Sequence, residues 1–182
     1  MLYPVLLGVW AALCAASAIA ALKLKPELLA KVEKLPRATI PGAILGFIDL
    51  LWCIPNAEPI LPEAFHVYLL PAAIILGILA WFFLDKLFAR ALGGLLILLA
   101  HYFHKESFAD AMPAGMLFAI LCFVFGTWGI FVSGKPHLMR DLLRKLCANQ
   151  NWRIAVASLL GAYAVTSLIA LSFHLLSTGH SA

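Results

Sequence analysis

Histidine residues carry the clearest potential for chemistry in this sequence. The stretch "HYFHKES" places His101 and His104 three residues apart at the end of an apolar run, so one helical face would carry both. His66 and His174 lie at similar depth at the ends of two other apolar runs. Two imidazoles on different helices can hold the iron of a b-type haem. His66, His101, His104 and His174 are therefore the candidate cofactor-binding residues.

Sulfur-containing residues near the same level extend this hypothesis to copper, because imidazole, thiol and thioether ligands together suit that metal. They are Cys53, Met112 and Met116. The competing interpretation is that these histidines mark where helices leave a membrane and contact lipid headgroups or a partner protein. His180 lies in a hydrophilic tail, and the spacing of the two methionines is typical of helix packing.

Asp49 is the other residue of interest, because it lies inside the apolar run 38–54. An acidic side chain at the centre of a bilayer costs about 2.5–3.5 kcal/mol on insertion scales and usually faces a helix bundle or a polar cavity. Counting about 1.5 Å per residue from Ala38 places it roughly 16 Å from the inner edge of the membrane. It is a candidate proton-relay or ion-binding residue. The alternatives are a neutral acid bonded to a neighbouring backbone or hydroxyl group, and an ion pair with a partner chain.

Composition requires that these residues be positioned by helices in a membrane. Of the 182 residues 64% are hydrophobic and 12% are charged, which leaves too little polar surface for a soluble domain. A transmembrane helix needs about 20 apolar residues, and no alternating pattern indicates a β-barrel. The sequence therefore predicts an all-α integral membrane protein, a single domain over residues 1–182. Its six expected spans are 2–22, 38–54, 66–84, 87–103, 112–133 and 154–176.

The distribution of Lys and Arg predicts the orientation of these spans. Twelve of the 13 basic residues fall in three alternate connections, which we expect to be cytoplasmic, and only Lys105 falls on the other side. Both termini are then outside, and we expect a bacterial inner membrane. The basic residues follow the first apolar run rather than precede it, so we interpret that run as an uncleaved span and not a secretory signal.

Two of the basic connections predict amphipathic helices on the inner membrane surface. "KPELLAKVEKL" and "KPHLMRDLLRKL" both begin with Lys-Pro, which suits a first helical turn. Apolar residues at helical spacing follow in each segment. The expected partners of these helices are the bilayer and the anionic lipids of its inner leaflet, which account for the basic pI near 9.0 without nucleic acid.

Small residues indicate where helices can approach closely. Gly8, Ala12, Ala16 and Ala20 recur every four residues in the first span, and the last span has a similar series. Close backbone contact over small side chains drives helix association in lipid. We expect these two spans to have intimate neighbours, which are either each other or helices of another protein. The series in the last span is Ser158, Ala162, Thr166 and Ala170.

Three functions follow as hypotheses. The first is a non-catalytic subunit that anchors or scaffolds a larger membrane complex with other membrane proteins, since we find no nucleotide-binding loop, metalloprotease motif or catalytic triad. The second is an electron-transfer or metal-handling protein that binds b-type haem or copper through the outer histidines. The third is a small transporter or channel that uses Asp49.

Overall fold

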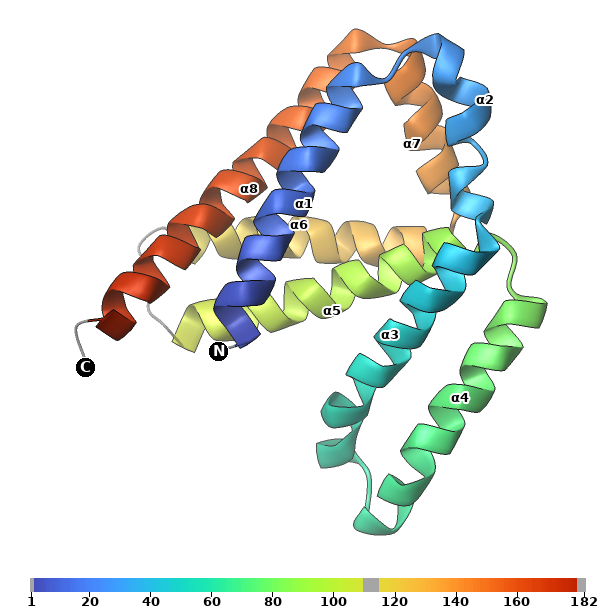
Figure 1. Ribbon diagram of the computed structural model, residues 1–182, viewed down its shortest axis with the longest axis vertical. Coiled ribbons are helices and arrows are strands. Elements are labelled where there is room, and N and C mark those ends of the chain that lie inside the picture. Colours follow the sequence, from blue (N-terminus) through green and yellow to red (C-terminus); the bar gives the residue numbers. More distant parts are fainter. Residues whose placement is uncertain (1, 110–114, 180–182) are drawn as a thin grey trace. The chain divides into compact units, whose positions relative to one another are not determined.

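The computed structural model describes residues 2–109 and 115–179, and these residues are almost entirely helical with no strand among them. Six of the helices are long and apolar enough to cross a membrane. The all-α class and the six apolar helices of spanning length are thereby confirmed. Those helices are α1 (Leu2–Lys23), α3 (Thr39–Ala57), α4 (His66–Phe83), α5 (Leu87–Ala109), α6 (Gly115–Gly134) and α8 (Gln150–Gly179), as labelled in Figure 1.

The helix ends depart from the expected spans mainly at α5 and α8. α5 continues past residue 103 to Ala109, and α8 begins at Gln150 rather than at residue 154. At the start of α8 the Asn149 side chain accepts a hydrogen bond of 2.8 Å from the backbone N–H of Asn151, as a helix N-cap does. Hydropathy marks the apolar part of a helix, whereas capping groups determine where the helix itself begins.

The two segments expected to be amphipathic helices differ from each other. Residues 137–148 form a continuous helix, α7 (His137–Ala148), in which Met139 and Leu146 are buried. Residues 26–37 form only short turns: η1 (Pro26–Leu28), α2 (Leu29–Val32) and η2 (Leu35–Arg37). Pro36 explains part of this difference, because it lacks the backbone N–H that an α-helix running through this segment would use.

Internal contacts divide the chain into two compact units. Unit 1 comprises residues 1–29, 100–124 and 143–182, and unit 2 comprises residues 30–99 and 125–142. In unit 1, α1 and α8 lie side by side along much of their length (Figure 1). In unit 2, α3 and α4 form a hairpin, joined through η3 (Glu58–Ile60) and η4 (Glu63–Phe65).

The core of unit 1 is a cluster of aromatic rings. Phe103, Phe118 and Tyr163 are almost fully buried, and Trp10 lies beside them. The ring centroid of Tyr163 is 5.6 Å from that of Phe118 and 5.8 Å from that of Trp10. Such tilted and edge-on pairs each stabilise a fold by about 0.5–1.5 kcal/mol beyond the area they bury. The Tyr163 hydroxyl also shares a hydrogen bond of 3.2 Å with the Cys122 thiol.

Unit 2 is held together by helices that approach through glycine. A Cβ atom placed on Gly93 of α5 would lie 2.6 Å from the backbone oxygen of Gly129 in α6, so no other residue fits there without moving the helices. On another side of α5, a Cβ atom on Gly42 of α3 would overlap the backbone nitrogen of Phe88. Close approach of this kind supplies the van der Waals contact that replaces hydrophobic drive in lipid. α5 is therefore the central helix of unit 2.

Candidate functional site

Asp49 lies where α3 crosses α5 in unit 2. Gly42 and Gly46 are one turn apart on α3, and Asp49 follows on the same helical face. A Cβ atom on Gly46 would lie 3.7 Å from the Cβ of Ala91, in ordinary van der Waals contact. Because successive contacts advance together along both helices, α3 and α5 run parallel here and bring Asp49 to the level of Gly94.

The carboxyl group of Asp49 is packed against the backbone of α5. Asp49 is only 8% exposed, and a Cβ atom placed on Gly94 would lie 2.9 Å from its Oδ2 atom. Its Oδ1 atom is buried and has no hydrogen-bond partner among the described residues. A buried polar atom of this kind is rare in proteins, because leaving it unsatisfied costs about 1–3 kcal/mol.

No basic side chain in the described ranges pairs with this carboxyl group. Arg90 lies one turn before Gly94 on α5, but its guanidinium donates hydrogen bonds elsewhere. Its Nη1 is 3.1 Å from the Ser133 carbonyl oxygen, and its Nε is 3.4 Å from the Asp85 carbonyl oxygen. On α3 the next titratable group is the thiol of Cys53, one turn beyond Asp49 and exposed.

The histidines singled out from the sequence occupy separate surroundings. His66 is in unit 2, where its Nε2 lies 2.9 Å from the Glu58 carbonyl oxygen and 3.1 Å from that of Leu61. Its ring therefore bridges the connection between α3 and α4. The other three are in unit 1, where His101 and His104 are exposed and the His174 ring packs edge-on against Tyr3 at 5.2 Å.

These positions add no support to haem or copper binding. Within residues 2–109 and 115–179, no three His, Cys, Asp or Glu side chains gather in a cluster that could hold a metal ion. The Nε2 atom of His66 is already engaged by backbone carbonyls. Met112 and His180 lie outside the described residues. Cofactor binding by His66, His101, His104 and His174 stays a prediction.

The small-residue series of α1 faces away from the interior of unit 1. Ala12, Ala16 and Ala20 are exposed, whereas Leu7 and Cys14 on the opposite face are buried. At the other end of α1, Gly8 meets α8, since a Cβ atom there would lie 3.6 Å from Leu171 Cδ2.

α8 shows the same division along its length. The small residues that recur every four positions in α8 are buried at Thr166 and Ala170 but exposed at Ser158 and Ala162. A Cβ atom placed on Gly161, beside that exposed part, would have no neighbour within 4 Å. The two helices are thus each other's neighbours, but much of their small-residue surface is not used within the described part of unit 1.

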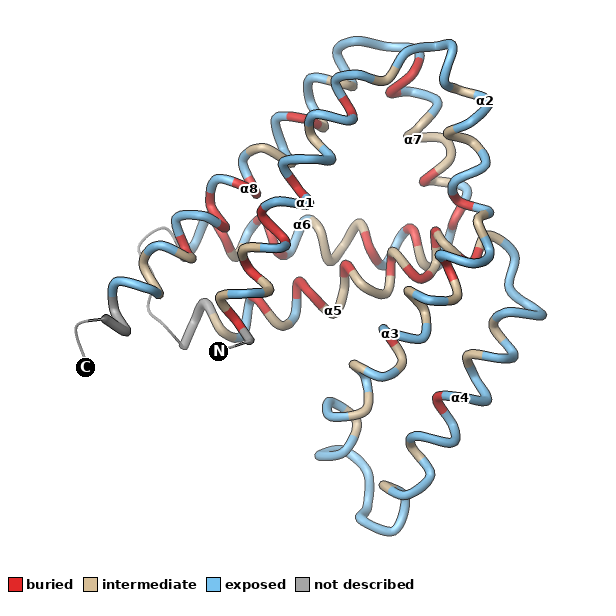
Figure 2. Tube along the Cα trace, viewed as in Figure 1, coloured by how far each residue is buried: buried red, intermediate tan, exposed pale blue. Residues whose placement is uncertain are grey.

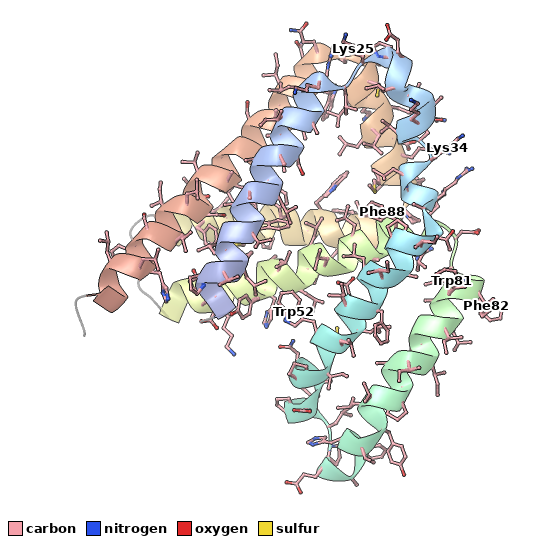
Figure 3. The ribbon with its side chains drawn as sticks, in the orientation of Figure 1. Lys25, Lys34, Trp52, Trp81, Phe82 and Phe88 are labelled. Atoms are coloured by element: carbon pink, nitrogen blue, oxygen red, sulfur yellow. The ribbon has the colours of Figure 1, made fainter. Side chains whose placement is uncertain are left out.

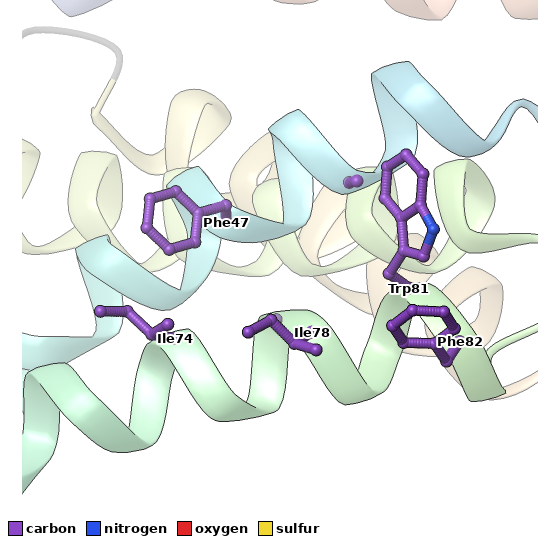
Figure 4. A pocket seen from close by; sticks show the side chains of 7 residues that line it. Phe47, Ile74, Ile78, Trp81 and Phe82 are labelled. Atoms are coloured by element: carbon purple, nitrogen blue, oxygen red, sulfur yellow. The ribbon is translucent and has the colours of Figure 1, made fainter.

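An apolar groove of about 340 Å³ runs between α3 and α4 in unit 2 (Figure 4). Most of α4 is exposed, as the pale tube in Figure 2 shows. Trp81 and Phe82 lie at one end of α4 (Figure 3). The groove is lined mainly by apolar side chains, and its lining residues are Ala43, Phe47, Ile74, Gly77, Ile78, Trp81 and Phe82.

Two features of this geometry were missed in the sequence. The pair "GAILG" at residues 42–46 is a small-xxx-small motif that could have located the α3–α5 crossing. The Ser133 carbonyl that Arg90 bonds and the Leu24 carbonyl that Arg153 bonds carry no local sequence signal, because each lies far from its arginine along the chain.

Comparisons with protein-family models, with curated proteins and with solved structures find no match for this chain. A fold alone does not determine a function. The surfaces and the side chains themselves must therefore indicate the function.

Proposed function

We propose that this chain is a non-catalytic membrane subunit that anchors or scaffolds a larger membrane complex by binding a transmembrane helix of another protein. The observation that carries the proposal is the exposed row of small side chains on α1, namely Ala12, Ala16 and Ala20. The exposed residues Ser158 and Ala162 of α8 extend the same kind of surface.

Helices associate in lipid through close contact over small side chains. Lipid tails are as apolar as leucine, so a lipid-facing helix has no need of small residues, whereas a helix partner does. α1 already packs within the chain through its other face, at Leu7, Trp10 and Cys14. A row of small residues opposite that packed face suits the close approach of a second chain.

The proposed placement follows the charge distribution. The three basic connections face the cytoplasm and both termini face outward, in a bacterial inner membrane. α7 lies on the inner surface, where the exposed Arg144 and Lys145 meet anionic lipid headgroups. The ammonium group of Lys145 also lies 5.1 Å from the ring centroid of Trp152, which links the end of α7 to the start of α8.

Purification in mild detergent, followed by mass spectrometry and an absorption spectrum, tests this function. We expect stoichiometric membrane partners to co-purify with the native chain. In Ala16→Leu their recovery should fall about tenfold, equivalent to about 1.4 kcal/mol of binding, because leucine blocks close approach.

The matched control is Ser17→Leu, which adds a similar side chain a quarter turn away at another exposed position. Recovery there should equal that of the native chain. Equal recovery in the Ala16→Leu and Ser17→Leu variants would contradict the proposal. A Soret band or stoichiometric copper without partners would favour the electron-transfer function instead.

A further inference from the structure

We propose that the carboxyl group of Asp49 is a proton-binding site, built into the crossing of α3 and α5 and exchanging its proton with solution. This function is independent of partner binding by α1 and α8. It provides the step that a proton-coupled transporter or a proton pathway requires, namely reversible protonation within a membrane-spanning helix.

The carboxyl group of Asp49 has an oxygen atom without a hydrogen-bond donor. The residue is only 8% exposed, and its Oδ1 atom meets no donor among the described residues. An ionised carboxylate in these surroundings would lack both water and a counter-charge, so the neutral acid is favoured. A bound proton removes the charge and with it the larger part of the cost of burying this group.

The surroundings of Asp49 suit a proton better than a metal ion. Hard cations take about six or more oxygen ligands. The part of the chain that the structure describes has no cluster of three His, Cys, Asp or Glu side chains. The residue that meets the Asp49 carboxyl group from α5 is Gly94, which has no side-chain oxygen.

The carboxyl group of Asp49 occupies space that glycine leaves open on the facing helix. A Cβ atom at position 94 would lie 2.9 Å from Oδ2, so the carboxyl group would have to shift to make room for it. α3 comes closest to α5 at Gly42, two turns before Asp49, where a Cβ atom would overlap the Phe88 backbone nitrogen. The position of this carboxyl group therefore depends on the residue at position 94.

Two neighbouring titratable or charged groups bear on the exchange. The Arg90 guanidinium on α5 donates to the Ser133 and Asp85 carbonyls rather than to Asp49, so it does not hold the carboxylate form. The Cys53 thiol on α3 is exposed one turn further on, which places an accessible surface of α3 close to the site.

Labelling with the apolar reagent dicyclohexylcarbodiimide tests the proposal on the full chain in detergent. The acid form of a carboxyl group adds across one C=N bond of the reagent, its proton passing to nitrogen, and the adduct rearranges to a stable N-acylurea. We expect mass spectrometry to find this adduct on Asp49 at neutral pH and to find less of it as pH rises. Asp49→Asn, which keeps the shape of the side chain, should show no adduct at that position.

Three controls make the outcome decisive. An apolar maleimide should label Cys53 in the same sample, which establishes that reagents reach this part of α3. Gly94→Ala should change the pH dependence of Asp49 labelling, because its Cβ displaces Oδ2, whereas Gly134→Ala, which meets nothing within 4 Å, should not. Labelling of Cys53 without labelling of Asp49 would overturn the proposal. It would also be overturned if the labelling of Asp49 did not vary with pH, or if sodium prevented that labelling at constant pH.

Discussion

Two arginine side chains cap the ends of neighbouring helices. Arg90 donates to the Ser133 carbonyl in the last turn of α6, and Arg153 donates to the Leu24 carbonyl just beyond α1, at 2.6 Å. The last carbonyls of a helix have no partner within it, and the helix dipole makes this end negative. Each arginine therefore satisfies a group that is costly to leave bare in a membrane protein.

Replacement of Arg153 by glutamine should destabilise unit 1. The charged hydrogen bond to Leu24 is lost, which we expect to lower the free energy of unfolding by about 1.5–3 kcal/mol. Thermal unfolding in detergent, followed by tryptophan fluorescence, measures the change. Arg37→Gln is the matched control, because Arg37 is exposed and should tolerate the change with little effect. Equal unfolding midpoints in the two variants would show that the Arg153 cap contributes nothing to stability.

Helix α5 shows how a pair of adjacent glycines serves two neighbours. Gly93 faces α6, where it meets Gly129 and Ser133, whereas Gly94 faces α3 at Asp49. Adjacent residues point about 100° apart around a helix, so the pair opens two contact surfaces at one level. α5 tolerates little change at Gly93, where the neighbours are backbone atoms, whereas at Gly94 the neighbour is a side chain that can shift.

Substitution of Gly93 by alanine should separate α5 from α6. The added Cβ atom would lie 2.6 Å from the Gly129 oxygen and 2.7 Å from the Ser133 nitrogen, both of which are backbone atoms that cannot rotate away. We expect unit 2 to lose about 1–3 kcal/mol of stability, as overpacked interiors do.

The same alanine substitution at Gly161 of α8 is the control, because a Cβ atom there meets nothing within 4 Å. That change should be neutral or stabilise the helix by up to about 1 kcal/mol. Thermal unfolding of the two variants under one detergent condition compares them. A Gly93→Ala variant as stable as Gly161→Ala would contradict the tight crossing.

At the scale of the whole molecule, the positive charges predict how the chain crosses the membrane. In the proposed topology the connection after α3 is outside and the connection after α6 is inside. Ile60 is 82% exposed in the first, and Lys135 is exposed in the second. Both positions can therefore carry a cysteine without disturbing the packing.

In a Cys53→Ser background, an impermeant maleimide added to intact cells should label Ile60→Cys but not Lys135→Cys. Permeabilised cells should show label at both positions. The reason is that translocating clusters of Lys and Arg is unfavourable, so we expect the basic connection that contains Lys135 to stay in the cytoplasm. The reverse labelling pattern would invert the orientation and every inner or outer assignment made from it.

The helices could be predicted from the sequence more fully than the site. Each apolar run matches a helix of spanning length, because the length and hydropathy of a segment are its own properties. Asp49 was also identified in advance, since a single acid in an apolar run is conspicuous. Its lack of a partner could not be predicted, because Gly94 and Arg90 lie more than forty residues away along the chain.

The sequence by itself determined the all-α class, the six apolar helices and the charge pattern of their connections. Only the tertiary structure decided which face of each helix is used. Ala12, Ala16 and Ala20 were expected to meet either the last span or a helix of another protein, and the face of α1 that packs inside unit 1 is the opposite one. The His66 ring bonds to nearby carbonyls rather than to a second histidine. The physical reason is that transfer into lipid depends on one segment alone, whereas packing depends on which surfaces of several helices meet.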